Sequence, residues 1–206
     1  MNPSQSLPQS EPDALRTAGP RLYTWISDKG RVVEQVRVVR GTGEWLRAVG
    51  RVVAAADQPD HPAFSLTYEV EIDSVDELRR LSLATATAEY ERAVELARDS
   101  EGSWLLTDSL GTRERVGSGD IRDVDVTFSV FFASLIVRRH RLHAQPGEVS
   151  ERVLSVDAVS LAVTEDTVTF TSDDEHVHGI TATASTSATV DSEGVIVDVA
   201  GYSRRA

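Results

Sequence analysis

Cysteine is absent from this chain of 206 residues. Disulfide bonds, thiol nucleophiles and cysteine-based zinc sites are therefore excluded. Long hydrophobic runs are absent as well, because the most apolar stretch, residues 126–137, contains Thr127, Ser129 and Ser134. A membrane-spanning helix needs about 20 consecutive apolar residues. This stretch is too short and too polar to span a membrane.

Basic residues are scarce: 33 acidic residues stand against 21 basic ones, the net charge is −12, and Lys29 is the single lysine. A nucleic-acid-binding protein needs a basic surface to displace counterions from phosphates. An anionic membrane surface would also repel an acidic chain. The charge therefore argues against a nucleic acid or a membrane surface as the partner, and a small molecule remains. The oligomeric state does not follow from the charge.

Residues 1–20 lack the positive start and apolar core of a secretory signal, and they are polar and rich in Pro and Ser. This composition is typical of a disordered segment. We therefore expect a disordered tail over residues 1–20, a single folded domain over residues 21–206, and a cytoplasmic protein.

Motifs of the common catalytic and nucleotide-binding sites are missing too. The chain has no G-x-S-x-G, G-x-x-x-x-G-K-[ST] or H-E-x-x-H motif, and no G-x-G-x-x-G after an expected strand. The sequence therefore names no cofactor, and we expect a protein that is not an enzyme.

What the chain does contain is a repeated alternation of apolar and polar residues, rich in Val and Thr, which indicates β-strands. Residues 21–40 form a predicted hairpin with its turn at 28–30, and residues 44–55 and 63–73 are the next two predicted strands. Residues 152–172 suggest two strands with a turn at Glu165 and Asp166. Residues 179–205 suggest a long strand, a turn at 192–194 and a closing strand. The pattern predicts an all-β protein with one long antiparallel sheet.

Two segments need separate interpretation. In residues 88–102, Tyr90 and Val94 fit a helix face or a strand face, and propensity alone favours a helix. Residues 123–137 suggest a strand whose first half is apolar on one face and whose second half is apolar on both. Such a strand is buried on both sides, or it passes from a wall into a cavity.

A sheet this long, with few helices to cover it, must curl on itself or bury a ligand. We therefore expect a half-barrel or roll that encloses an apolar cavity and holds a lipid or glycolipid by apolar contacts. Arginines at its end could bind a phosphate or sugar-acid head group, or they could pair with surface carboxylates. The candidate ligand contacts are Phe128, Phe131, Phe132, Leu135, Arg138, Arg139, Asp123 and Asp125.

Two residue pairs leave other functions open. Asp123 and Asp125 share a strand face and could act as acid and base or hold a metal. His176 and His178 also share a face and could ligate a metal, although an exposed acidic hairpin end is the simpler interpretation. The alternatives to lipid binding are therefore a metal- or carboxylate-dependent enzyme and a module that oligomerises through a sheet edge.

Three segments resemble a bacterial family described as "putative glycolipid-binding". Residues 118–142 resemble its D-[IV]-D-[LIV] block with the following S-P-x-T-N-T-L-P-I-R-R-L, and residues 188–205 resemble its closing V-D-x-x-G-L-V-x-D-Y-P-G-L-x-R block. Trp25, Glu34 and Gly50, and the E-G-S-W at 101–104, fit its opening strands and hairpin. Asp123, Asp125, Ser129, Phe131, Leu135, Arg138 and Arg139 match the first block, and Asp191, Gly194, Asp198, Gly201 and Arg204 match the second.

The resemblance implies a long antiparallel sheet bent into a half-barrel, similar to bacterial lipoprotein-localisation carriers, and it implies a strand at residues 88–102. The chain departs from the family at both prolines and the Thr-Asn pair of the first block, where it has Val130, Phe132, Ala133 and Ile136. Val199 and Ala200 likewise replace Tyr-Pro in the second block. These departures imply a more lipophilic ligand or no glycolipid ligand at all.

Overall fold

The structure, a computed structural model, describes residues 19–40, 46–56, 62–173, 176–180 and 185–206. This part of the chain contains fifteen strands and one helix. In chain order they are β1 (Arg21–Ser27), β2 (Val32–Arg40), β3 (Leu46–Ala54), β4 (Phe64–Ile72), β5 (Leu78–Ala86), β6 (Glu91–Arg98), β7 (Trp104–Asp108), β8 (Arg113–Gly117), β9 (Asp123–Val126), α1 (Phe131–Arg139), β10 (Gly147–Val156), β11 (Val163–Ser172), β12 (Val177–Ile180), β13 (Ser185–Val190), β14 (Ile196–Val199) and β15 (Ser203–Arg205).

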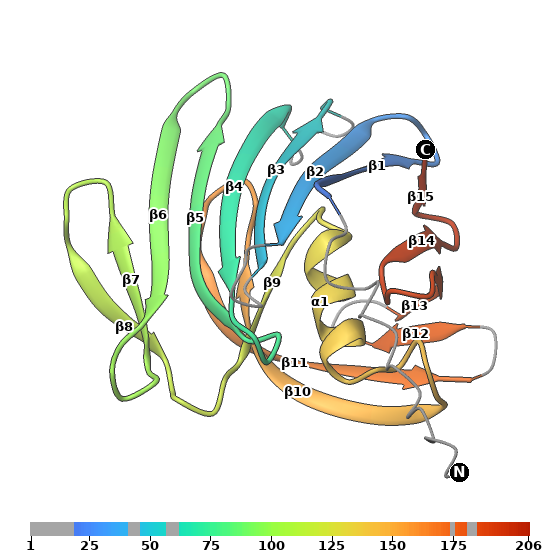
Figure 1. Cartoon of the computed structure of the whole chain (residues 1–206). Coiled ribbons are helices and arrows are strands. Elements are labelled where there is room, and N and C mark those ends of the chain that lie inside the picture. The colour runs from blue at the N-terminus through green and yellow to red at the C-terminus, as the bar shows by residue number, and fades with distance from the viewer. Residues whose placement is uncertain (1–18, 41–45, 57–61, 174–175, 181–184) are drawn as a thin grey trace, which may run out of the picture.

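All the strands belong to one sheet (Figure 1). Strands β1 to β8 form an antiparallel meander, and β10 to β15 form a second one. Antiparallel pairing of β1 with β15 joins the two meanders in the middle of the sheet. Strand β9 pairs in parallel with β10, and β8 and β9 are the two edges, so the sheet curves without closing into a barrel. The predicted all-β fold, with one long curved sheet, is confirmed.

Alternation along the strands creates the inner face. Strand β3 buries every second residue, and so does β4, whose inward side chains are Phe64, Leu66, Tyr68, Val70 and Ile72. The ambiguous segment forms strand β6, because pairing with both β5 and β7 outweighs helix propensity. Gly30, at a φ of 65°, closes the predicted turn between β1 and β2.

Three local predictions are wrong. The strand expected over 123–137 ends at Val126, and a helix follows. Phe128 has a φ of 68°, which ends extended structure, and an apolar run does not by itself distinguish a strand from a helix. Glu165 and Asp166 lie within β11 rather than in a turn. The long strand after residue 179 is instead divided between the antiparallel strands β12 and β13, with residues 181–184 outside the described part.

Helix α1 lies inside the curve of the sheet, between β2 and β3 on one side and β12 to β14 on the other (Figure 1). Phe131, Phe132 and Leu135 belong to the larger apolar core, and Ile136 and Val137 belong to a smaller core with residues of β10 to β12. The helix therefore occupies much of the apolar interior that the sheet encloses. Among the described residues, no helix is long and apolar enough to cross a membrane.

Candidate ligand-binding site

A buried carboxylate holds the first turn of α1. Helix α1 has no side-chain cap of its own at Val130, but Glu34 of β2 is 2% exposed and accepts hydrogen bonds from the Val130 and Phe131 N–H groups at 2.6 and 3.3 Å. The hydroxyls of Tyr68, at 2.6 Å, and Ser129 also donate to it. Burial raises the pKa of Glu34, and these four hydrogen bonds partly oppose that rise. Glu34 therefore fixes the position of α1 on the sheet.

A buried ion pair holds the other end of the helix. Arg139 donates to the carboxylate of Asp123, and both side chains are nearly buried. Glu151 of β10 lies 3.4 Å from the same guanidinium and 2.7 Å from Nε2 of His140. Burial raises the pKa of Asp123, and the positive charge of Arg139 opposes the rise. Asp123 and Arg139 thus form a buried ion pair with each other.

An apolar crevice of about 130 Å³ separates one side of α1 from strands β11 to β14. Among the described residues that line it, the polar side chains are the hydroxyl-bearing Ser129, Thr186 and Tyr202. The remaining lining residues are Val130, Ala133, Phe170, Val177, Gly179, Ala188, Ile196 and Val199. This crevice is the apolar space that α1 leaves on the inner face of the second meander.

A second crevice, of about 30 Å³, lies on the other side of the same helix and is rimmed by arginines. Arg21 of β1, Arg40 of β2 and Arg138 of α1 line it together with Glu193. Its other lining residues are Gly19, Tyr23, Val38, Leu46, Phe131, Ser134, Leu135 and Val195. We call it the arginine crevice.

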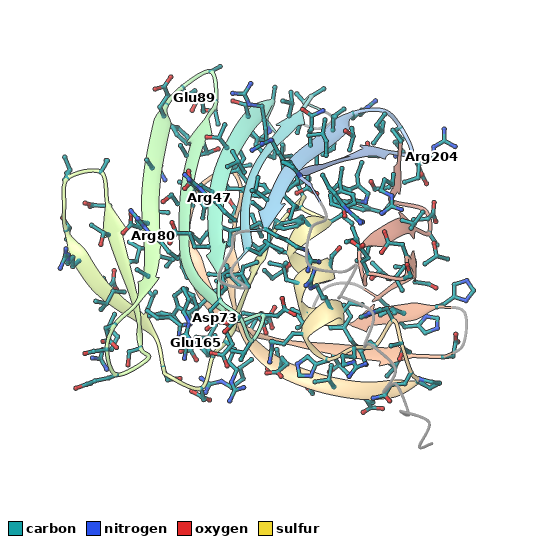
Figure 2. The ribbon with its side chains drawn as sticks, viewed as in Figure 1. Arg47, Asp73, Arg80, Glu89, Glu165 and Arg204 are labelled. Atoms are coloured by element: carbon teal, nitrogen blue, oxygen red, sulfur yellow. The ribbon has the colours of Figure 1, made fainter. Side chains whose placement is uncertain are left out.

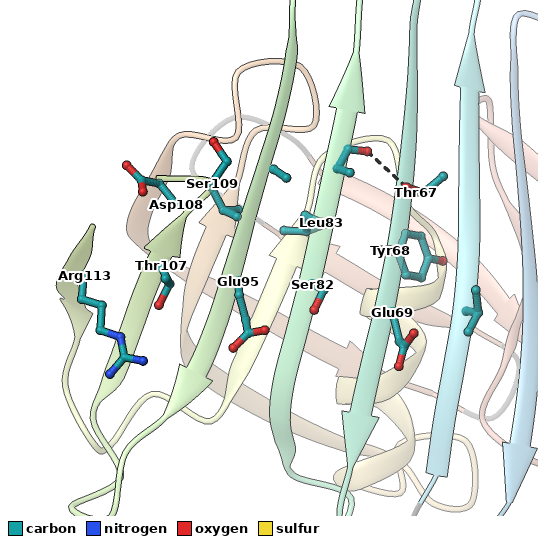
Figure 3. A pocket seen from close by; sticks show the side chains of 14 residues that line it. Thr67, Tyr68, Glu69, Ser82, Leu83, Glu95, Thr107, Asp108, Ser109 and Arg113 are labelled. Carbon is teal, nitrogen blue, oxygen red and sulfur yellow. Dashed lines mark hydrogen bonds between the residues drawn. The ribbon is translucent and has the colours of Figure 1, made fainter. Parts of the chain in front are cut away.

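A larger hollow, of about 540 Å³, lies on the opposite face of the sheet. Figure 3 shows Glu69, Ser82, Glu95 and Thr107 side by side on β4 to β7, with α1 behind the sheet. Glu69 pairs with Arg47, and Glu95 pairs with Arg80; both arginines are labelled in Figure 2. This outer groove is open to solvent, and charged and hydroxyl-bearing side chains line much of it, so it does not match the expected enclosed apolar cavity.

A family model described as "Putative glycolipid-binding" matches residues 22–205. The chain belongs to this family. No curated protein matches the chain.

Two solved structures have the same fold as this member of the glycolipid-binding family. A DUF1089 family protein from Pseudomonas aeruginosa is 18% identical, with a TM-score of 0.64 over 95% of this chain and 97% of that one. A beta-barrel-like protein of the domain of unknown function DUF1849 from Brucella abortus is 11% identical, with a TM-score of 0.52 over 90% of this chain and 93% of that one. At such identities these likenesses establish the fold alone.

The closing block of the family forms the turn that packs on α1. The Asp191 carboxylate accepts hydrogen bonds from the N–H groups of Glu193 and Val195, both at 3.0 Å. Gly194 has a φ of 79°, and a Cβ there would lie 3.1 Å from Cα of Arg138. Aspartate and glycine at these positions therefore let the turn approach the helix and place Glu193 in the arginine crevice.

Three of the eight predicted contacts meet in one place: Phe131, Leu135 and Arg138 line the arginine crevice. Phe132 is wholly buried in the core against Tyr68, and Phe128 packs edge-on against Phe64. Both aromatics therefore support the helix rather than line the apolar crevice, and their role as ligand contacts stays a prediction. Arg138 and Arg139 both pair with carboxylates, as the acidic composition suggested.

Sequence reasoning missed Arg21, Arg40, Ser134 and Tyr202 as lining residues, because they come from distant segments. Glu34 did leave a signal. It occupies the inward phase of β2 beside Val36, where the alternation calls for an apolar residue. The histidine pair is less informative: the rings of His176 and His178 stack at 6.1 Å, and the described residues contain no group of three metal-ligating side chains.

Asp125 gives the protein a predicted pH dependence. Burial raises its pKa to about 6 from 3.8, and the negative charge of Asp166 adds to the rise. Folding therefore favours the protonated carboxyl, so its stabilising contribution is complete below pH 3.8 and is lost as the pH rises through about 6. As the pH rises, the wild type should lose on the order of 3 kcal/mol of its free energy of unfolding, and Asp125→Asn should not show this loss. Urea denaturation from pH 4 to 8 tests this. The same dependence of the free energy of unfolding on pH in the wild type and in the variant would contradict it.

Proposed function

We propose that the protein binds the hydrocarbon part of a lipid or glycolipid, without catalysing a reaction, in the apolar crevice between α1 and β11 to β14. The observation that carries this proposal is the lining of the crevice, whose described side chains are apolar apart from three hydroxyls. Membership of the glycolipid-binding family supports the ligand class. Burial of apolar surface would supply about 25 cal/mol per Å².

The departures of this chain from the family pattern support the same site. Val130 and Ala133 line the crevice, and Phe132 and Ile136 fill the core beneath it. The positions at which the family has proline, threonine and asparagine therefore present or support apolar surface in this chain. That arrangement favours a hydrocarbon chain over a sugar ring at this place.

The volume indicates how much of a ligand the crevice takes. About 130 Å³ is well under the roughly 300 Å³ at which sites for drug-sized molecules begin. It is close to the roughly 150 Å³ of an apolar cavity that holds one benzene ring. The crevice therefore accommodates the end of one hydrocarbon chain, and a longer tail requires α1 to move.

The interactions of two buried carboxylates support a role without chemistry. Asp123 is neutralised by Arg139, and all four hydrogen bonds of Glu34 serve the position of α1, Ser129 and Tyr68. A general acid or base must instead be free to exchange a proton with a substrate. Neither residue has that freedom.

Filling the crevice tests the function. Ala133→Leu should weaken binding of the uncharged fluorescent probe N-phenyl-1-naphthylamine at least tenfold, because the larger side chain occupies the space into which the phenyl ring of the probe fits. The matched control is Ala93→Leu in the outer groove, where an exposed alanine lines the larger hollow. Fluorescence titration gives both affinities, and native mass spectrometry of the purified protein shows co-purified lipid. Binding lost in Ala93→Leu but kept in Ala133→Leu would move the site to the outer groove, and no binding would end the proposal.

A further inference from the structure

We propose that the ligand is a single-chain amphiphile with a carboxylate head group, and that this carboxylate binds in the arginine crevice beside α1. The inference rests on the proposed function, because the apolar crevice takes the tail. A fatty acid and an acidic glycolipid that carries a uronic acid both present this chemistry.

Charge is the first reason. Arg21 lies 2.5 Å from Glu193, and Nε of Arg138 lies 3.3 Å from Asp76. Arg40 lines the same crevice as a third guanidinium. Among the described residues, these three arginines are paired with two carboxylates, which leaves one positive charge in a chain whose net charge is −12. A singly charged anion complements that excess, and guanidinium groups bind carboxylates through paired hydrogen bonds.

Size is the second reason. A single water molecule needs roughly 10–15 Å³ of such space, so the arginine crevice, at about 30 Å³, has room for two waters or for one carboxylate group. A sugar ring is much larger than this space. The ring of an acidic glycolipid would therefore lie outside the crevice, with only its carboxylate inserted.

The two crevices lie on either side of one narrow contact between α1 and β14. The Ser134 hydroxyl accepts a hydrogen bond from the N–H of Ile196 at 3.1 Å. Ser134 and Val195 line the arginine crevice, whereas their neighbours Ala133 and Ile196 line the apolar crevice. A ligand with its head in one crevice and its tail in the other therefore crosses this contact and displaces the hydrogen bond between Ser134 and Ile196.

Four decyl compounds separate the possibilities in isothermal titration calorimetry. Decyl glucuronide has a carboxylate where decyl glucoside has a hydroxymethyl group, so the glucuronide should bind at least tenfold more tightly. Decanoate tests a carboxylate without a sugar, and decyl phosphate tests a larger anion. Tighter binding of decanoate than of the glucuronide identifies a fatty acid as the ligand, and the reverse order identifies an acidic glycolipid.

Arginine variants locate the head group. Arg138→Gln should weaken binding of the carboxylates roughly 10- to 100-fold, because a hydrogen bond to a charged group is lost, and it should leave decyl glucoside unchanged. Arg40→Gln should act in the same direction and leaves both ion pairs of the crevice in place. The matched control is Arg47→Gln, which breaks a comparable exposed ion pair with Glu69 on the outer face. Hydrogen exchange at the Ile196 amide should speed up when decanoate is bound.

The outcomes distinguish the two proposals. If none of the four compounds binds, the proposed function fails. If all bind with equal affinity, or if Arg138→Gln and Arg47→Gln behave alike, the tail site stands and the carboxylate site is overturned. Preference for decyl phosphate would also overturn it, because the crevice would then accept a larger anion.

Discussion

Glu34→Ala is expected to lower the free energy of unfolding by about 3–5 kcal/mol. The substitution leaves the hydroxyls of Tyr68 and Ser129 and the N–H of Val130 without their acceptor in a buried site. It also removes the negative charge at the N-terminus of α1. Guanidinium denaturation followed by circular dichroism measures the loss, and α1 should lose protection against hydrogen exchange before the sheet does.

Two variants make this expectation specific. Glu34→Gln keeps the volume and one acceptor oxygen, so it should cost less than the alanine variant. Because burial raises the pKa of Glu34, the glutamine variant should also differ least from the wild type at acidic pH. Glu69→Gln is the matched control for an exposed, ion-paired glutamate, with an expected change within about 1 kcal/mol. A loss in Glu34→Ala no larger than in Glu69→Gln would contradict the role assigned to Glu34.

Gly50→Ala should destabilise the protein by about 3 kcal/mol or more, through overpacking. A Cβ at residue 50 would lie 2.1 Å from Cζ of Tyr68, which is paired with Gly50 across β3 and β4. The tyrosine ring cannot move aside easily, because Phe131 and Phe132 pack against it and its hydroxyl is bound to Glu34. Thermal unfolding would show the loss as a lower Tm.

The control for this substitution is Gly147→Ala, where a Cβ would meet only Leu142, at 3.4 Å. Removing a glycine there should change stability by no more than about 1 kcal/mol. The clash is also testable as a coupling: in a Tyr68→Ala background, Gly50→Ala should cost little. Additive losses in the double variant would place the cause of the destabilisation elsewhere.

The fold was largely predictable because its strands carry their own pattern. The inward residues of β4, for example, follow strict alternation, and the glycine turn after β1 marks a hairpin. Tertiary pairing, rather than local propensity, decided the segment that forms β6. The resemblance to the glycolipid-binding family identified that strand where propensity pointed to a helix.

Helix α1 was not predictable from periodicity, because its apolar residues fit the spacing of a strand as well as that of a helix. What decides its conformation is Glu34, about one hundred residues earlier in the chain, whose carboxylate accepts the N–H groups of the first turn. The arginine crevice escaped prediction for the same reason. Arg21, Arg40 and Arg138 meet only because β1, β2 and α1 are brought together by the curve of the sheet.

The pairing of β1 with β15 has a consequence for synthesis. Residues 25–27 of β1 pair with residues 203–205, so β1 must wait for a strand that is made more than 170 residues later. Each meander can assemble as it emerges, yet the two halves become a single sheet only when residue 205 is available. Until then the edge of β1 that does not face β2 is unpaired and can hydrogen-bond to a strand of another chain.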